Sequence, residues 1–312
     1  LSFLNVILIR NGAKIGGGKM CWFKRKKTDE LKTHKKVKIG IALGGGGARG
    51  IGHIGALRAF EELGVKFDYL AGTSAGSIVG ALYAFGLNSF EMEDILLGLK
   101  EADIRKKNWF FMPSSTENLE KLLRRIFEKD LVFSELKKPF IAVAVNIKNG
   151  KEVRIESGSV AKACCASSAV PGVFKPVCFD DMHLVDGGLA NNVPADVVRE
   201  MGANIVFAVD VNPTRGRGTD SLKLFSMLSQ TVGVMMQANV ENKLRFADLV
   251  IIPPLGEFSS TKLGDVKKMI DIGYHAVMDK KDEIIKLVGN KPRIKDKIIW
   301  RINTTKRRKN HS

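Results

Sequence analysis

The segment 67–84, FDYLAGTSAGSIVGALYA, constrains the fold more than any other part of the chain. Its apolar start at 69–71 predicts a short buried strand, and the small apolar residues after Gly76 predict a helix. Between the two, Gly72, Ser74 and Gly76 form the Gly-x-Ser-x-Gly pattern of a nucleophile elbow, a sharp turn that exposes a serine hydroxyl above the end of a strand. Ser74 is therefore the candidate nucleophile.

The two motif glycines have a steric purpose. A side chain at Gly72 or Gly76 would strike the neighbouring strand or helix where the turn is tightest. Chains of this composition contain the five-residue pattern by chance often enough that the pattern alone is weak. The prediction for Ser74 therefore depends on its place between a strand and a helix, whose N-terminal N–H groups point toward the same spot.

A second glycine-rich segment lies between an apolar run at 37–43 and a helical pattern at 51–64. Its residues are Gly44, Gly45, Gly46, Gly47, Ala48, Arg49 and Gly50. A strand, a glycine loop and a helix N-terminus place several backbone N–H groups around one space of the size of an anion. The loop is therefore expected to hold a negatively charged oxygen.

Two interpretations compete for this loop. Gly45, Gly47 and Gly50 match the dinucleotide pattern G-x-G-x-x-G, which also needs an acid at the end of the second strand. Asp68 lies at about the right distance but precedes that strand. An oxyanion hole needs only N–H groups close to the serine, so we favour it. Arg49 is expected to neutralise charge in the loop or to fix the loop through a salt bridge.

The candidate base follows a brief apolar strand at 183–185. Asp186 ends this strand, and Gly187 and Gly188 come directly after it. An acid at the carboxyl end of a strand, released by two glycines, can point at the nucleophile of a neighbouring strand. The same tripeptide is also common as a simple turn, and both interpretations stay open at this point.

Strand and helix patterns alternate along the rest of the chain. Further strands are expected at 140–147, 152–156, 204–211 and 248–252, and further helices at 88–103, 116–130, 159–168, 221–242 and 263–287. This alternation predicts one α/β domain, a three-layer α/β/α arrangement around a mostly parallel central sheet.

The net charge of +17 is confined to the two ends of the chain. Residues 1–38 hold 11 Lys and Arg against 2 acids, and residues 291–312 hold 9 against 1, which leaves 30 of each sign between them. We therefore divide the chain into a basic N-terminal segment at 1–36, a catalytic domain at 37–290 and a basic tail at 291–312. Because the body is neutral, we expect no nucleic-acid binding; the ends are solubilising arms or contacts to an anionic membrane.

The start of the chain and its cysteines bear on the cell compartment. The segment 15–20, IGGGKM, has the form of a translated ribosome-binding site followed by a start codon, so translation is expected to begin at Met20. No apolar run approaches the roughly 20 residues of a membrane span. The four cysteines lack disulfide or zinc spacing, which favours reduced thiols in a cytoplasmic protein, at most peripheral at the inner membrane face.

Taken together, the glycine loop, the serine elbow, the block 166–176 and the Asp186 turn resemble the patatin-like phospholipase family, most closely its short bacterial members, in order and spacing. The resemblance covers about 37–277. It implies a lipid acyl hydrolase, of phospholipase A, lysophospholipase or carboxylesterase type, that needs no calcium or other cofactor. Ser74 and Asp186 would form a catalytic dyad, and the loop from Gly45 to Gly50 would be the oxyanion hole.

The residues alone leave two alternatives to a Ser74–Asp186 hydrolase open. A Ser74, Asp186 and His275 triad has the chain order of α/β-hydrolases, but His275 falls inside an expected helix. His53 is expected to pack in the helix after the glycine loop, and His183 lies too close to Asp186 along one strand to orient it. A different class of protein, a non-catalytic module that binds acyl lipids or nucleotides with a relic site, has the same motifs. A probe that reacts covalently with an active serine separates the two classes.

Overall fold

The computed structural model describes residues 37–99, 114–212, 240–260 and 264–289, together with Thr231, Val234 and Lys262. The chain divides after Lys36 into two units, and every described residue belongs to the second. Both basic ends and most of the helix expected at 221–242 lie outside the described residues. No helix in the described ranges is long and apolar enough to cross a membrane.

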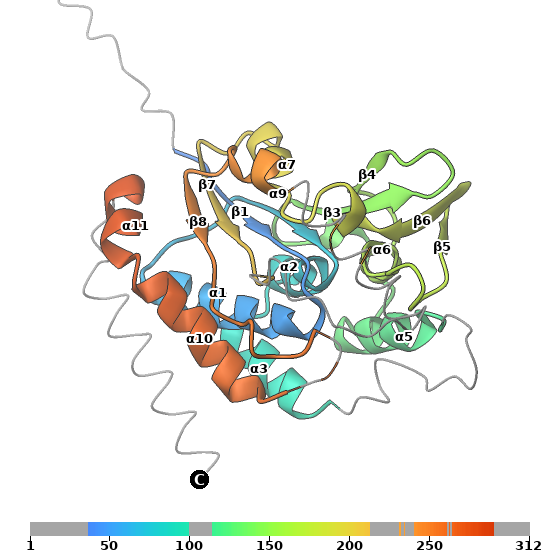
Figure 1. Cartoon of the computed structure of the whole chain (residues 1–312), viewed down its shortest axis with the longest axis horizontal. Coiled ribbons are helices and arrows are strands. Elements are labelled where there is room, and N and C mark those ends of the chain that lie inside the picture. Colours follow the sequence, from blue (N-terminus) through green and yellow to red (C-terminus); the bar gives the residue numbers. More distant parts are fainter. Residues whose placement is uncertain are drawn as a thin grey trace, which may run out of the picture. The chain divides into compact units, whose positions relative to one another are not determined.

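The described strands form one mixed sheet in the order β5-β6-β3-β2-β1-β7-β8, with β4 also paired to β3 (Figure 1). Strands β1, β2, β3, β7 and β8 are parallel, whereas β4, β5 and β6 run antiparallel to their partners. Short hairpins join β3 to β4 and β5 to β6, which forces antiparallel pairing there. The strands are β1 (Ile39–Leu43), β2 (Tyr69–Thr73), β3 (Phe140–Asn146), β4 (Glu152–Ile155), β5 (Val177–Phe179), β6 (Met182–Asp186), β7 (Ile205–Val209) and β8 (Leu249–Ile251).

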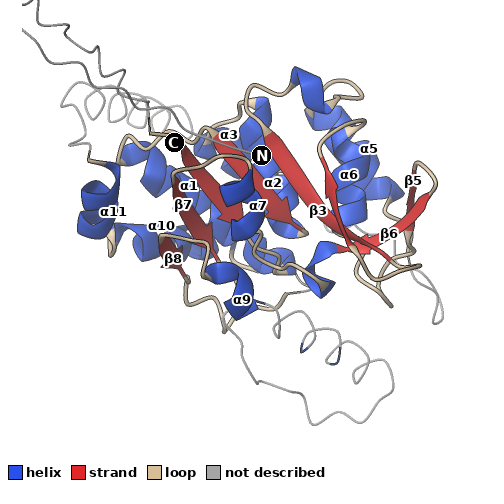
Figure 2. Ribbon diagram, turned by 90° about the horizontal axis from the view of Figure 1, so that it is seen from above, coloured by secondary structure: helices blue, strands red, loops and turns tan. Residues whose placement is uncertain are grey.

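Helices cover both faces of the sheet, which confirms the layered α/β fold. Figure 1 shows α1, α2 and α10 on one face and α7 and α9 on the other, and Figure 2 views the sheet from the α7 side. The α-helices are α1 (Gly52–Glu62), α2 (Ala75–Phe85), α3 (Ser89–Leu97), α5 (Glu117–Ile126), α6 (Val160–Ser167), α7 (Ala195–Glu200), α9 (Val240–Leu244), α10 (Val266–Met278) and α11 (Lys281–Val288). Short 3₁₀ helices are η1 (Gly47–Ile51), η2 (Phe133–Glu135) and η3 (Gly187–Leu189).

The two faces of the sheet carry residues of different size. Successive side chains of a strand point to opposite faces, so Ile41 and Leu43 of β1 enter the large core under α1 and α2, whereas Ala42 faces the smaller core under α7. Ala71 and Ala208 lie on the α7 face as well. These small residues let the short helix α7 approach the sheet closely.

The single helix expected at 263–287 is two helices in the structure. Helix α10 ends at Met278, and α11 begins at Lys281 with Asp282 and Glu283 in its first turn. Acidic side chains stabilise a helix N-terminus and destabilise a C-terminus, so these residues favour a new helix start over continuation. The apolar periodicity of the segment does not show this break.

Helices α1 and α10 pack with their backbones in contact. A Cβ atom at Gly55 would lie 1.8 Å from Ile270 O, and one at Gly273 would lie 2.0 Å from Gly52 O. Real Cβ atoms never approach backbone so closely, so each glycine is required by the helix crossing. The crossing holds α10 over α1, the helix that follows the glycine loop.

We expect Gly273→Ala to destabilise the protein by roughly 3 kcal/mol, because the methyl group must push the two helices apart. The matched control is Gly98→Ala, whose added Cβ would meet no atom closer than 3.5 Å. That control is expected to change stability by less than about 0.5 kcal/mol. Urea unfolding midpoints measure both, and equal midpoints for the two variants would contradict the close crossing.

Candidate active site

The register of β3 brings the elbow and Asp186 together. Thr73, the last residue of β2, pairs with Val143 of β3. Asp186, the last residue of β6, pairs with the next residue of β3, Ala144. Thr73 and Asp186, more than a hundred positions apart in sequence, thus pair with adjacent residues of β3.

Strands β2 and β6 also lie on the same edge of β3. Backbone groups of successive strand residues point to alternate edges. Pro139 O accepts from Leu70 N–H of β2 at 3.1 Å, and Ile147 N–H donates to His183 O of β6 at 3.0 Å. Pro139 and Ile147 are an even number of residues apart, so these two bonds lie on the same edge. Asn146 is one residue out of step, and its N–H donates on the other edge, to Lys151 O before β4. Because β2 runs parallel and β6 antiparallel to β3, their carboxyl ends meet head to head.

Ser74 occupies the strained turn that the motif predicts. Its φ of 52° and ψ of −124° lie in a region that non-glycine residues rarely adopt, and the residue caps α2. A Cβ atom at Gly72 would lie 2.4 Å from Gly76 O, and one at Gly76 would lie 2.1 Å from Leu43 O. Both glycines therefore have the expected steric role, and the turn is packed against the end of β1.

A buried serine at the end of α6, Ser167, binds the backbone of the elbow. Ser74 N–H donates to Ser167 Oγ at 2.9 Å, and that hydroxyl donates to Val143 O at 2.5 Å. Ser77 Oγ donates to Ser74 O at 2.6 Å. The backbone of Ser74 is thus held on both sides. Sequence reasoning placed Ser167 in a motif block without a role, because the residues it joins are far apart in sequence.

Asp186 is completely buried beside Ser74. Its Oδ1 accepts from Gly188 N–H at 2.8 Å, and Oδ2 has no partner with hydrogen-bond geometry among the described residues. Burial raises the pKa of the carboxyl from its ordinary 3.8 to about 6, although the hydrogen bond from Gly188 N–H and the nearby Ser74 hydroxyl favour the carboxylate. A carboxylate with one open oxygen and a raised pKa next to a hydroxyl is suited to accept its proton.

Gly187 allows this turn to approach β3. A Cβ atom there would lie 2.2 Å from Val143 O, the same carbonyl that Ser167 contacts. Gly188 supplies the N–H that holds Asp186. The two glycines therefore fix the carboxylate, by close packing and by a hydrogen bond.

The glycine loop lies against the elbow. A Cβ atom at Gly45 would lie 3.1 Å from Ser74 Cβ, and one at Gly50 would lie 2.4 Å from Ala75 Cβ. The loop therefore leaves no room for side chains next to Ser74. This contact is the third part of the convergence that the sequence motifs predict.

Some backbone N–H groups of the loop already donate hydrogen bonds within the protein, and others do not. Gly45 N–H donates to Asn192 O at 3.0 Å, and Ala48 N–H donates to Ser260 O at 2.9 Å. Within the described part of the chain, the N–H groups of Gly46 and Gly47 have no hydrogen-bond partner. Because the Gly45 N–H is used by Asn192 O, the N–H groups of Gly46 and Gly47 are the candidates in this loop for binding an oxyanion.

In the described part of the chain, Arg49 binds neutral acceptors that lie outside the loop. Its guanidinium donates to Phe258 O at 2.8 Å and to Asn212 Oδ1 at 2.6 Å, and its N–H donates to Gly46 O at 3.3 Å. Burial lowers the pKa of Arg49 from its usual value. The side chain fixes the loop to the segments after β7 and β8 through neutral acceptors.

Three histidines, at positions 53, 183 and 275, lie among the described residues. His53 is completely buried, and its Nε2 donates to Gly44 O at 2.7 Å; burial lowers its pKa to about 4, so the ring is neutral. His183 and His275 are exposed, the latter on α10. Among the described residues, no group of three His, Cys, Asp or Glu side chains could hold a metal ion.

The structure is a layered α/β protein in which the Ser74 turn, the Asp186 turn and the glycine loop converge. The chain belongs to the patatin-like phospholipase family, whose model matches residues 41–199. The crystal structure of VipD from Legionella pneumophila has the same fold, with a TM-score of 0.53 and 15% identity over 79% of this chain and 67% of that one.

Two relatives illustrate the similarity in sequence. Patatin-like phospholipase domain-containing protein 6 of Homo sapiens is 30% identical over 285 residues, which cover 76% of this chain and 20% of that protein. Lysophospholipase NTE1 of Pyricularia oryzae is 28% identical over 277 residues, which cover 76% of this chain and 18% of that protein. The chain thus spans about a fifth of the length of these relatives.

Proposed function

We propose that the protein hydrolyses acyl esters of lipids, with Ser74 as the nucleophile and Asp186 as its only side-chain base. The observation that carries this proposal is the meeting of β2 and β6 on one edge of β3, which sets Ser74 against a buried carboxylate.

The chemistry runs in two steps. Asp186 takes the Ser74 proton as Oγ attacks the ester carbonyl, and the protonated acid then gives that proton to the departing alcohol. This leaves an acyl group on Ser74. Asp186 next removes a proton from water, which attacks the acyl carbonyl, and returns it to Ser74 Oγ as the free acid departs. A burial-raised pKa makes the carboxylate a stronger base than an exposed aspartate.

The negative charge on the carbonyl oxygen requires donors near Ser74. We assign this role to Gly46 and Gly47, whose N–H groups have no partner in the described ranges, with Gly45 and Gly50 providing the necessary space. Each such donor lowers the barrier of acyl transfer by about 3 kcal/mol in comparable enzymes. Arg49 holds the loop in place through Phe258 and Asn212.

The substrate class follows from family membership. The family model is described as patatin-like phospholipase, and one relative is named a lysophospholipase. We therefore propose phospholipids or lysophospholipids as substrates. Because the chain spans only about a fifth of those relatives, the proposal concerns this domain and its chemistry.

The test compares wild type, Ser74→Ala and His275→Ala on p-nitrophenyl esters of increasing chain length, then on phospholipid and lysophospholipid. A fluorophosphonate probe is expected to add once, at Ser74, and Ser74→Ala is expected to lose both labelling and hydrolysis. His275→Ala is expected to keep wild-type rates within about twofold, since His275 is exposed on α10. A wild type without labelling would favour the binding-module alternative, and an inactive, folded His275→Ala would restore the triad.

A further inference from the structure

Two asparagines that follow the Asp186 turn contact both of the other segments of the site. Asn191 and Asn192 are almost completely buried, at 0% and 2% exposed. Asn191 N–H donates to Gly187 O at 2.9 Å, which keeps the pair close to the turn. Amide groups at such depth need hydrogen-bond partners, and the identity of these partners shows what the pair holds in place.

Asn192 binds the glycine loop through two hydrogen bonds. Its carbonyl accepts from Gly45 N–H at 3.0 Å, and its side-chain Nδ2 donates to Gly45 O at 3.3 Å. Gly45 O and Gly46 N–H belong to the same planar peptide group, in which they point in opposite directions. Holding Gly45 O therefore fixes the direction of Gly46 N–H, one of the loop donors without a partner.

Asn191 binds the end of the elbow strand. Its carbonyl accepts from Thr73 Oγ1 at 2.7 Å, and Thr73 directly precedes Ser74 in the strained turn. The main chain at Asn191 is thus tied to the segment that carries the nucleophile. All three of these hydrogen bonds join the segment that follows Asp186 to the other two segments of the site.

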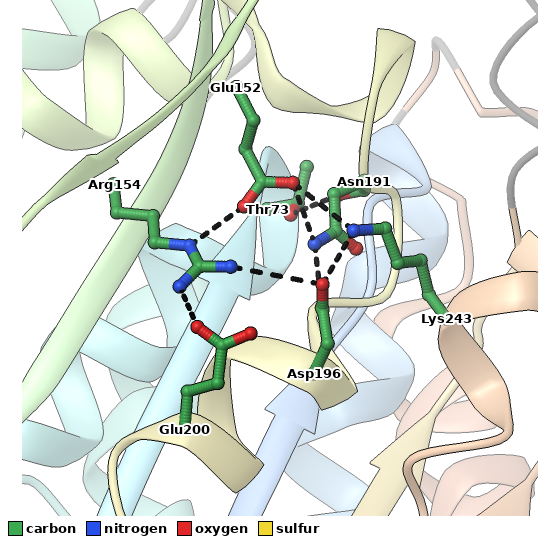
Figure 3. A network of polar contacts seen from close by, with 7 residues as sticks. All are labelled: Thr73, Glu152, Arg154, Asn191, Asp196, Glu200 and Lys243. Atoms are coloured by element: carbon green, nitrogen blue, oxygen red, sulfur yellow. Dashed lines mark hydrogen bonds and ion pairs between the residues drawn. The ribbon is translucent and has the colours of Figure 1, made fainter.

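A charged network holds the Asn191 side chain (Figure 3). Asn191 Nδ2 donates to Glu152 Oε2 at 3.1 Å and to Asp196 Oδ1 at 2.8 Å, and Lys243 Nζ bridges the same two carboxylates. Arg154 pairs with Glu152 on the outer side. Burial alone would raise the pKa of Asp196, but the Lys243 and Asn191 contacts outweigh burial and lower it. The two carboxylates that accept from Nδ2 fix the orientation of the Asn191 amide.

We propose that Asn191 and Asn192 are positioning residues for ester hydrolysis: they hold the glycine loop and the elbow at fixed places relative to Asp186. The role rests on the proposed function, since it concerns the same reaction. Neither residue touches the reacting atoms. A shift of the donors or of Ser74 by about 1 Å is enough to slow a reaction by about 10²-fold, so loss of either contact should appear in kcat.

The main test is Asn192→Asp, which keeps the shape of the side chain and removes the donor to Gly45 O. We expect kcat for a p-nitrophenyl ester to fall about 10²-fold while KM stays within about twofold. Fluorophosphonate labelling of Ser74 should slow by a similar factor, because the tetrahedral adduct needs the same donors. The matched control is Asn204→Asp at the opposite end of the sheet, where the side chain accepts from Lys38 N–H and, among the described residues, donates no hydrogen bond that the change would remove.

A second pair of variants covers the case in which Asn192→Asp fails to fold, as judged by its urea midpoint. Thr73→Val removes the hydroxyl that binds Asn191 O, whereas Thr73→Ser keeps it. We expect Thr73→Val to lower kcat about tenfold at unchanged KM and Thr73→Ser to restore it to within about twofold of wild type. A purely structural contact would lower the urea midpoint without this pattern.

The outcomes separate this role from the proposed function. If wild type is active and folded Asn192→Asp and Thr73→Val match its kcat and labelling rate, the positioning role is wrong and the proposed function stands. If wild type neither hydrolyses esters nor reacts with the probe, the proposed function fails and this role fails with it. Loss of kcat in both variants at near-constant KM supports it.

Discussion

Asp186→Asn is expected to slow ester hydrolysis by about 10³-fold and to make the protein more stable. Burial raises the pKa of Asp186 from 3.8 to about 6 in the folded protein. Its ionised form is therefore disfavoured on folding, and the carboxylate reduces stability increasingly as pH rises from about 4 to about 6. A difference of about two units corresponds to roughly 3 kcal/mol above pH 6, which the uncharged asparagine regains.

Urea unfolding of wild type and Asp186→Asn at pH of about 8 and about 4 measures this effect. The variant is expected to be more stable at the higher pH and similar to wild type at the lower, and its hydrolysis rate should fall by about 10³-fold. Asp196→Asn is the matched control, because contacts with Lys243 and Asn191 outweigh burial and lower the pKa of Asp196. This control should lose stability at pH 8. An Asp186→Asn protein that also lost stability would show that the carboxylate is stabilised by its contacts.

The rate of hydrolysis is expected to fall about tenfold per pH unit below about pH 6. The base must be ionised to accept the Ser74 proton, and the Asp186 carboxyl has a pKa of about 6. Activity should therefore be complete above this pH and be lost as pH falls through it. His53 cannot produce this midpoint, because burial lowers its pKa to about 4 and its ring is used by Gly44 O.

Initial rates of p-nitrophenyl ester hydrolysis from about pH 4.5 to 8, at constant ionic strength, give the profile of kcat/KM. His275→Ala serves as the control and should leave the midpoint where it is, since His275 is exposed on α10. A midpoint that moved in this variant would bring the histidine back into the mechanism. A flat profile across the range would exclude Asp186 as the base.

Local patterns in the sequence were sufficient for the strand–turn–helix units. The apolar runs and glycines around Ser74 and at 44–50 predict elements that the structure contains, because turns and helix starts depend on residues close in sequence. The short strand β5, the break between α10 and α11, and the used N–H of Gly45 were not predicted. Strand β5 and the hydrogen bond of the Gly45 N–H depend on partners that lie elsewhere in the chain. The helix break is favoured by the acidic residues at the start of α11, which the apolar periodicity does not record.

The sequence by itself determined the chemistry available to this protein: a serine in a strained turn, an acid freed by two glycines and a loop rich in N–H groups. Only the tertiary structure decided that these meet, by pairing Thr73 and Asp186 with adjacent residues of β3 on the same edge. It also decided which donors are free, through the contacts of Asn192 with Gly45. The physical reason is that strand register and buried hydrogen bonds are set by long-range packing, whereas a motif records only what neighbouring residues allow.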